Sequence, residues 1–301
     1  MPERDAAMRV SLCLDPGRSW PQLLALARRA DVAGWYGVYV CDHFMPHDPA
    51  GRPADGPVLE CWMVLAALAE QTAGVTLGSL VLGNTYRHPA VVARMAGTVD
   101  QISQGRLVLG IGAGWQPNEH AAYGIPLPAA RDRIAALDEA CAVIRSRLNQ
   151  QPSAAGGAAR RRRTRDAQPR ARLPLLVGGS GPGILRVAAR HADVWHTWAV
   201  PAEFARKNAV LDAMGREFGR RPADIVRACG GSVTVRASRN SPHAASESDV
   251  QGTPREVLSQ LLAFRDAGAG EFIVRDDARI PPEQALSQID AITMAVLPGL
   301  S

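Results

Sequence analysis

The stretch VTLGSLVLGNTYRHPAVVARMAGTVDQISQGRLVLGIGAGWQPNEH, residues Val75–His120, decides the fold of this chain. It predicts a strand at Val75–Leu82, a helix that begins at Pro89 and ends at Ile102, and a second strand at Arg106–Ile111. Proline is favourable in the first turn of a helix, because its missing N–H has no partner there in any case. Both strands are continuously apolar, as strands of a parallel sheet covered by helices are. The stretch therefore predicts one strand–helix–strand unit of an α/β fold.

The same unit recurs along the whole chain. Further strands are predicted at Arg9–Leu14, Gly37–Cys41, Leu173–Gly178, Val194–Thr197, Ile225–Val235 and Glu271–Val274. Further helices are predicted at Trp20–Ala33, Glu60–Thr72, Ala129–Leu148, Ile184–Ala192, Pro201–Phe218, Thr253–Ala267 and Pro282–Leu297. Eight strand–helix pairs in 301 residues predict a (β/α)8 TIM barrel, formed by a single domain over residues 1–301. A doubly wound open sheet is the alternative, but eight such units without a domain break favour the barrel.

Composition and charge indicate which classes of protein the sequence fits. The net charge of +5 is concentrated in a low-complexity stretch at about 151–172 that includes Arg160–Arg163, so the sequence does not indicate nucleic-acid binding. This Arg-rich stretch cannot build a core and is predicted to be an inserted loop. No apolar run is long enough to span a membrane, and the N-terminus has no secretory pattern, so we expect a cytoplasmic protein. The five cysteines lack metal-ligand spacing, and their odd number favours buried, reduced thiols.

Polar residues follow several predicted strands, at the edge where barrel enzymes build their sites. Asp42 and His43 come directly after the second strand, and His43 titrates near neutrality, so it could act as an acid, a base or a ring contact. Asn84 and Asn118 follow the third and fourth strands, and their amides can bind the edge of a heterocycle. The alternatives are a structural loop histidine, a turn asparagine and a helix cap.

The turn Gly178–Gly183 after the fifth strand has four glycines in six residues and leads into a helix. Backbone N–H groups at such a turn suit a phosphate, although a plain strand–helix turn is the alternative. The spacing is not that of the dinucleotide fingerprint. Three tryptophans, Trp115, Trp195 and Trp198, lie near strand ends, where they could pack against a flat cofactor or belong to the core.

Several catalytic motifs are absent from the sequence. It has no phosphate-binding lysine motif, no G-x-S-x-G elbow and no HExxH motif. Glu119 and His120 are adjacent, which is not zinc-ligand spacing. The sequence therefore predicts no metal site.

Several motifs together carry a family resemblance. They are Cys41-Asp42-His43-Phe44, the block from RHPAV to GWQPNEH, LLVGGSGPGILRVAARHADVWH and GTPREVLSQLLAFRDAGAGEFIV. The chain resembles the bacterial luciferase-like monooxygenase superfamily, and within it the oxidoreductases that depend on coenzyme F420, a deazaflavin. The resemblance implies a (β/α)8 barrel with a flavin or deazaflavin at the carboxyl ends of the strands. It also implies hydride transfer between C5 of F420 and a small organic substrate.

The resemblance also implies roles for individual residues. His43 is the expected catalytic acid or base, and Ser79-Leu80 is the expected place of a non-proline cis peptide against the cofactor ring. The remaining expected cofactor contacts are Asp42, Asn84, Ala113, Gly114 and Asn118 around the ring, and Gly178, Gly179, Ser180 and Gly181 around the phosphate.

Two features leave alternatives open. Trp115 stands where some relatives carry a catalytic glutamate, and the Arg-rich stretch stands where relatives have substrate-covering segments. An FMN-dependent luciferase-like monooxygenase is therefore one alternative, and a non-catalytic barrel with an interaction role is another. The arginines of the inserted loop could also contact the acidic tail of F420. The family is often dimeric, which implies a homodimer, although no stretch of the sequence marks an interface.

Overall fold

The computed structural model describes residues 7–46, 52–149, 173–236 and 249–300. The strands are β1 (Arg9–Leu14), β2 (Gly37–Val40), β3 (Thr76–Ser79), β4 (Leu82–Gly83), β5 (Leu107–Gly112), β6 (Leu175–Gly178), β7 (Val194–Trp198), β8 (Val226–Gly231), β9 (Val233–Val235), β10 (Val250–Gly252) and β11 (Glu271–Arg275). The helices are α1 (Trp20–Val32), α2 (Cys61–Gln71), α3 (Pro89–Ile102), α4 (Pro117–Ala122), α5 (Ala130–Asn149), α6 (Pro182–His191), α7 (Pro201–Glu217), α8 (Pro254–Asp266) and α9 (Pro282–Ala295). The predicted inserted loop at about 151–172 lies outside the described residues.

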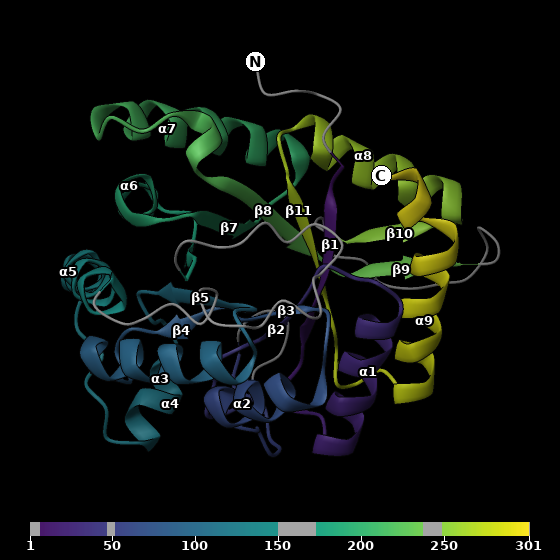
Figure 1. The fold of residues 1–301 in the computed structure, drawn as a ribbon, viewed down its shortest axis with the longest axis horizontal. Coiled ribbons are helices and arrows are strands. Elements are labelled where there is room, and N and C mark those ends of the chain that lie inside the picture. The colour runs from purple at the N-terminus through teal and green to yellow at the C-terminus, as the bar shows by residue number, and fades with distance from the viewer. Residues whose placement is uncertain (1–6, 47–51, 150–172, 237–248, 301) are drawn as a thin grey trace.

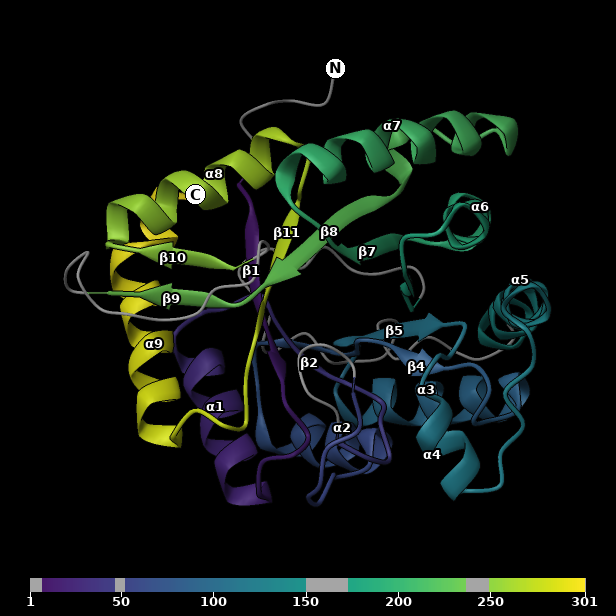
Figure 2. The same ribbon diagram turned by 180° about the vertical axis from the view of Figure 1, so that it is seen from behind.

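The strands close into a parallel barrel. Their order is β3-β2-β1-β11-β8-β7-β6-β5-β4, and a further pairing of β3 with β5 closes the ring. Every barrel pairing is parallel, including that of β1 with β11, which sets Arg9 opposite Glu271. The helices lie around the outside of the strands (Figures 1 and 2). The prediction of a (β/α)8 barrel is confirmed.

The third strand is interrupted, whereas the sequence predicts one strand over Val75–Leu82. β3 ends at Ser79 and β4 begins at Leu82, and a cis peptide bond joins Leu80 to Val81 between them. The expected cis bond at Ser79–Leu80 is therefore wrong by one position. Leu80-Val81-Leu82 continues the apolar pattern, so the break leaves no mark in the sequence.

The seventh strand is also divided, whereas Ile225–Val235 is predicted as one strand. β8 ends at Gly231, and β9 leaves the barrel to pair with β10 in a separate two-stranded sheet. β10 falls in a stretch predicted as a polar loop. Its backbone pairs with β9, and β10 packs against α8, whereas β9 contacts both α8 and α9 (Figures 1 and 2). The sequence pattern missed this branch because Val233–Val235, directly after Gly230-Gly231-Ser232, continues a strand-like pattern.

Two apolar layers form the core. The larger layer lies between the barrel and the helices. The smaller layer fills the barrel interior and consists of Cys13, Tyr39, Leu80, Val108, Leu176, Val194, Ala228 and Ile273. Because side chains fill the barrel, a ligand must bind at the strand ends. Within the described ranges, we find no helix with the length and hydrophobicity needed to cross a bilayer.

Candidate active site

Asp42, at the carboxyl end of β2, is a buried anchor for the loop that carries His43. Its carboxylate accepts two hydrogen bonds from Arg87, at 2.7 and 3.0 Å, and one from the backbone N–H of Gly83 at 3.1 Å. Burial raises the pKa of Asp42, against the opposing effect of Arg87. Arg87 also donates to Glu60 at 2.6 Å. Asp42 therefore ties the end of β2 to the loop after β4, and its side chain is fully engaged by protein groups.

His43 is held by a carboxylate that the sequence did not single out. The Nδ1 atom of His43 lies 2.9 Å from Oε1 of Glu119, which sits on α4 with no exposed surface. The other oxygen of Glu119 accepts from the backbone N–H groups of Phe44 at 2.7 Å and Met45 at 3.1 Å. Tyr86 donates its hydroxyl to the same carboxylate. One buried side chain thus fixes both the ring and the loop around it.

The environment favours the charged form of both partners. Burial alone would lower the pKa of His43, but the hydrogen bond to Glu119 outweighs it, and the pKa is raised. Burial alone would raise the pKa of Glu119, but the hydrogen bonds from His43 and Tyr86 hold it below its usual range. Because an ionised carboxylate can only accept, Nδ1 must donate to it. Nε2 is then the ring atom that can exchange a proton with a ligand.

Of the three tryptophans considered in the sequence, only Trp115 lies beside His43. Their rings meet edge to face, with centroids 5.6 Å apart, and Trp115 is half exposed. Trp195 is a core residue, because it is fully buried and donates Nε1–H to the carbonyl of Gly179 at 2.8 Å. Trp198 packs its ring against His196 instead.

Ser79 ends β3, where it pairs with Val40, and Leu80 follows it into the barrel interior. The hydroxyl of Ser79 bridges to β5, donating to the carbonyl of Gly110 at 2.8 Å and accepting from its N–H at 3.0 Å. Leu80 belongs to the apolar layer inside the barrel. The Ser79 hydroxyl is therefore used in pairing β3 with β5. A ligand at this point would contact the backbone and Leu80 instead.

The loops after β4 and β5 pack against each other. The N–H of Asn84 donates to the carbonyl of Gly112 at 3.0 Å. Gly114 has a φ of +77°, and a Cβ there would lie 2.5 Å from Oγ1 of Thr85. Ala113 packs on the outer core, and Asn118 points its amide nitrogen at Sδ of Met45, 3.8 Å away. Among the described residues, the side-chain oxygen of Asn84 is one of several buried polar atoms without a hydrogen-bond partner, as are the amide oxygens of Gln116 and Asn208.

The glycine turn after β6 is open toward solvent at its centre. Gly178 ends the strand, and Gly179, with a φ of +132°, donates its N–H to the carbonyl of His196 at 3.0 Å. Gly181 is the N-cap of α6, and a Cβ added there would meet no atom within 4 Å. Lys207 reaches the turn from α7 and donates to the carbonyl of Ser180 at 3.1 Å. A helix N-terminus beside a lysine favours an anion.

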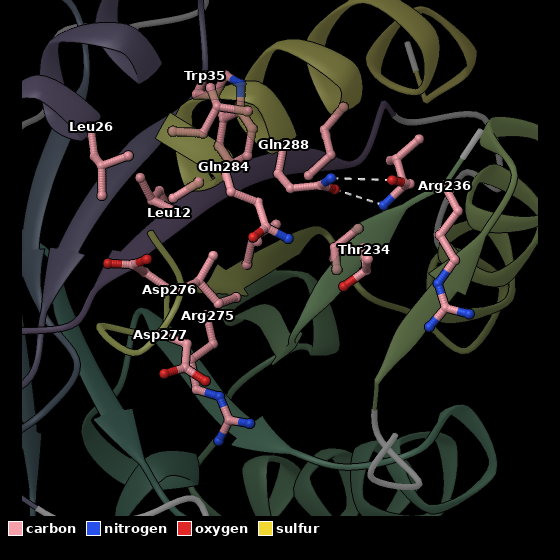
Figure 3. Close-up of a pocket in the computed structure, with 17 residues that line it drawn as sticks. Leu12, Leu26, Trp35, Thr234, Arg236, Arg275, Asp276, Asp277, Gln284 and Gln288 are labelled. Carbon is pink, nitrogen blue, oxygen red and sulfur yellow. Dashed lines mark hydrogen bonds between the residues drawn. The ribbon is translucent and has the colours of Figure 1, made fainter. Parts of the chain in front are cut away.

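A pocket of about 370 Å³ opens beside His43. Side chains from the ends of β1, β2 and β11 and from the segment around Gly56 line it, and the pocket is large enough for a small organic molecule. A second pocket, of about 280 Å³, lies between β9 and α9 (Figure 3). Arg275, Asp276 and Asp277 line both pockets and form the wall between them.

The second pocket has a structural framework of its own. In Figure 3, Gln288 reaches from α9 to β9, where it accepts from the N–H of Val235 at 2.7 Å and donates to its carbonyl at 3.1 Å. Asp276 receives two hydrogen bonds from Arg18, each of 2.7 Å. These contacts attach the β9 branch and the end of β11 to the barrel. Among the described residues, no cluster of three or more His, Cys, Asp or Glu side chains could hold a metal ion.

The structure therefore gathers the predicted residues at one end of the barrel, at the carboxyl ends of the second to fifth barrel strands. Sequence reasoning missed Glu119 and Arg87, the two charged groups that hold His43 and Asp42. The signal for Glu119 was its place in a Pro-led helical turn, directly after the loop of the fourth predicted strand. The arrangement combines a proton-exchanging imidazole, an apolar-lined pocket and an anion-favouring turn.

Known proteins resemble this chain in sequence and in fold. The sequence model of the luciferase-like monooxygenase family matches residues 6–248. An F420-dependent glucose-6-phosphate dehydrogenase of Intrasporangium calvum is 37% identical over 172 residues, which cover 55% of this chain and 50% of that protein. An F420-dependent hydroxymycolic acid dehydrogenase of Mycobacterium tuberculosis is 27% identical over 315 residues, covering 93% of this chain and 84% of that protein. The match with the first of these relatives, and with others of the same description, spans about half of their length.

Solved structures share the fold. The F420-dependent tetrahydromethanopterin reductase of Methanopyrus kandleri superposes with a TM-score of 0.75 at 18% identity, covering 98% of this chain and 99% of that one. A type II Baeyer–Villiger monooxygenase of Pseudomonas putida, in complex with FMN, gives a TM-score of 0.73 at 19% identity, covering 97% and 98% of the two chains.

Proposed function

The chain belongs to the luciferase-like monooxygenase family, and we propose that within it the chain is a coenzyme F420-dependent oxidoreductase acting on a small organic substrate. The observation that carries this proposal is the His43–Glu119 pair at the mouth of the 370 Å³ pocket. A buried carboxylate that keeps an imidazole protonated is what an acid catalyst beside a hydride-transfer site requires. The curated relatives that match with 27–37% identity are named for F420, which supports the choice of cofactor.

The residues present fit a deazaflavin. The unpartnered side-chain oxygen of Asn84 can accept from an N–H of a pyrimidine edge. Ala113 and Gly114, in the loop after β5, and Asn118, on α4, are further candidate contacts, and Asp42 holds the loop after β2 through Arg87 and Gly83. The turn of Gly178, Gly179, Ser180 and Gly181 can bind a phosphate, with Lys207 beside it. Leu80 lies inside the barrel at the break between β3 and β4, and Ser79 is the last residue of β3. F420, when bound, supplies a hydride donor or acceptor at its C5.

The protein contributes proton transfer and orientation. Nε2 of His43 gives a proton to the reacting oxygen of a carbonyl substrate, or takes one from an alcohol, while Glu119 stabilises the charged ring. Glu119 also holds the N–H groups of Phe44 and Met45, so the imidazole keeps its position as its charge changes. The ring of Trp115 covers one edge of His43 and reduces its contact with water.

An FMN-dependent monooxygenase is the second candidate. Its support is the structural likeness to a monooxygenase in complex with FMN, which at 19% identity concerns the fold alone. A non-catalytic barrel is less well supported, because the relatives that match in sequence are named as F420-dependent dehydrogenases.

Titration of the purified protein with F420 and with FMN, followed by cofactor fluorescence, tests the proposal. We compare the wild type with Gly181→Asp and Gly181→Ser. Both residues are good N-caps and the site has room for them, so both variants should fold as the wild type does. The added carboxylate should weaken F420 binding by about tenfold or more, and the serine should have little effect.

Each other outcome changes the assignment. Preference for FMN would make the protein a candidate oxygen-using monooxygenase. Binding of neither cofactor would contradict the proposal and favour the non-catalytic reading. Equal affinity of the wild type and both variants for F420 would mean that the phosphate does not bind at the glycine turn.

A further inference from the structure

Two cysteine thiols meet at the wall of the pocket beside His43. The Sγ atoms of Cys13, on β1, and Cys41, just after β2, are 3.5 Å apart. The parallel register sets Cys13 opposite Tyr39, so Cys41, two residues further on, faces the same side of the sheet. Both cysteines line the 370 Å³ pocket, and Cys41 is partly exposed. A small molecule in the pocket can therefore reach them.

The two thiols have different chemical characters. The hydrogen bond from Cys13 lowers the pKa of Cys41 against the effect of burial, and the nearby His43 lowers it further. Asp15 and Arg275 also face Cys41 and act in opposite directions. The pKa of Cys13 is raised by its hydrogen bond to Cys41 and by burial. Cys41 is thus the better nucleophile, with Cys13 beside it as a second thiol.

The other cysteines show what isolation does to a thiol. Cys141 and Cys229 are buried, and burial raises the pKa of each to about 12. Cys229 points its sulfur at the carbonyl of Ala199, 3.4 Å away, rather than at another sulfur. These residues are suitable internal controls.

We propose that Cys13 and Cys41 form a redox-active dithiol that small organic disulfides entering the pocket oxidise to an intramolecular disulfide. The thiolate of Cys41 attacks one sulfur of the small disulfide, forms a mixed disulfide and releases one thiolate. Cys13 then attacks the sulfur of Cys41, and its proton passes to the departing second thiolate. The two cysteines lose two electrons in all, and the small disulfide is reduced to two thiols.

The oxidised pair would change the neighbouring site. Disulfide sulfurs are about 2.05 Å apart, so the two sulfur atoms must approach by about 1.5 Å from their present separation. Cys41 directly precedes Asp42 and His43, so this movement pulls on the loop that carries the imidazole. Oxidation therefore links the redox state of the dithiol to the geometry of the site.

Peptide mass spectrometry tests the proposal without any cofactor. The reduced, folded protein is treated with bis(2-hydroxyethyl) disulfide, the remaining thiols are alkylated, and the peptides are mapped. We expect the Cys13 and Cys41 peptides to be linked in the wild type and in Cys229→Ser. In Cys13→Ser, Cys41 should instead retain the mercaptoethanol group, and in Cys41→Ser, Cys13 should stay unmodified.

Rates give a second measurement that needs no variant. In the folded wild type, Cys41 should react with the probe at least about tenfold faster than Cys141 or Cys229. Equal rates, or a stable mercaptoethanol adduct on Cys41 with Cys13 still free, would overturn the proposal. Circular dichroism of each serine variant verifies that it is folded, and Cys13→Ala replaces Cys13→Ser if the hydroxyl is not tolerated.

Discussion

Oε1 of Glu119 lies 2.9 Å from Nδ1 of His43, although 76 positions separate the two residues in the chain. The contact joins α4 to the loop after β2, and the same carboxylate holds the backbone of Phe44 and Met45. The charge state of His43 is therefore set by a residue on a different strand–helix unit. Several properties of the protein should depend on this pair.

Replacing Glu119 by glutamine should lower the pKa of His43. The carboxylate is the main group that raises this pKa, and burial, which remains in Glu119→Gln, acts in the opposite direction. At a given pH, a smaller fraction of the imidazole would be protonated. NMR titration of the histidine resonances measures the shift.

Asp138→Asn provides the control for that titration. Asp138 pairs with His191 at 2.9 Å, on the outer helices, and has no contact with His43. This variant should change the titration of His191 alone. An unchanged His43 midpoint in Glu119→Gln would show that the pair does not control the proton.

The His43–Glu119 pair should stabilise the fold over a limited pH range. The raised pKa of His43 gives stability that is present below its unfolded pKa of roughly 6.5 and is lost as pH rises through the higher folded pKa. The lowered pKa of Glu119 gives stability that is present above roughly pH 4.3 and is lost as pH falls through the lower folded pKa. The free energies of unfolding of wild type and His43→Asn, from urea titrations, should therefore differ most between roughly pH 4.3 and 6.5, by about 1–3 kcal/mol. A difference in unfolding free energy between wild type and His43→Asn that grows above pH 8 would contradict this prediction.

Loss of Arg87 should be severe because it leaves Asp42 as a buried charge without its ionic partner. The Asp42 side chain has no exposed surface, and Arg87 gives it both of its charged hydrogen bonds. Arg87→Met should reduce the free energy of unfolding by roughly 3–5 kcal/mol. Urea denaturation measures this loss.

Arg186→Met is the matched comparison. Arg186 pairs with Glu217 at 2.8 Å, but both side chains are 55% exposed. Its loss should cost less than about 1 kcal/mol. Similar losses of unfolding free energy in the two variants would mean that burial does not increase the contribution of the Asp42–Arg87 pair to stability.

Val81 occupies the space that side chains at two glycine positions would need. A Cβ on Gly178 would lie 2.8 Å from Cγ1 of Val81, and a Cβ on Gly112 would lie 2.8 Å from Cγ2. Gly178→Ala should therefore destabilise the protein by about 1–3 kcal/mol, as measured by thermal or urea unfolding.

A second substitution distinguishes this clash from a general intolerance of alanine. In the double variant Gly178→Ala/Val81→Ala, the combined loss should be smaller than the sum of the single losses by about 1 kcal/mol or more. Gly181→Ala, where the Cβ meets nothing, should be close to neutral. If the losses of the two single variants simply add, the Cβ introduced at Gly178 does not clash with Val81.

The local sequence pattern was sufficient to predict the barrel and to select candidate site residues. The bounds of β1 were predicted to the residue, and His43, Asn84 and the glycine turn were found because they follow apolar strands. The interruption at Leu80-Val81 was missed because apolar residues continue on both sides of it. The one at Ser232 was missed because Val233–Val235 resumes a strand-like pattern directly after Gly230-Gly231-Ser232. Pairing with neighbouring strands, and not local propensity, decides where such strands end.

Glu119 and Arg87 were missed in the sequence for a different reason. Glu119 and Arg87 act on residues 76 and 45 positions away, and neither belongs to a motif with fixed spacing. A glutamate in a short helix and an arginine before a proline are ordinary surface residues in a sequence. Only the closure of the barrel buries them against the end of β2.

The pairing of β1 with β11 has a consequence for the order of events during synthesis. Ser11 donates to Glu271 at 2.6 Å across a separation of 260 positions, and Arg9 lies opposite the same residue. While the chain emerges from the ribosome, the outer edges of β1 and β8 remain unpaired until β11 is available to join them. β11 therefore closes the barrel. A nascent chain that stalls before Glu271 would expose two unpaired strand edges, to which chaperones and other nascent chains can bind.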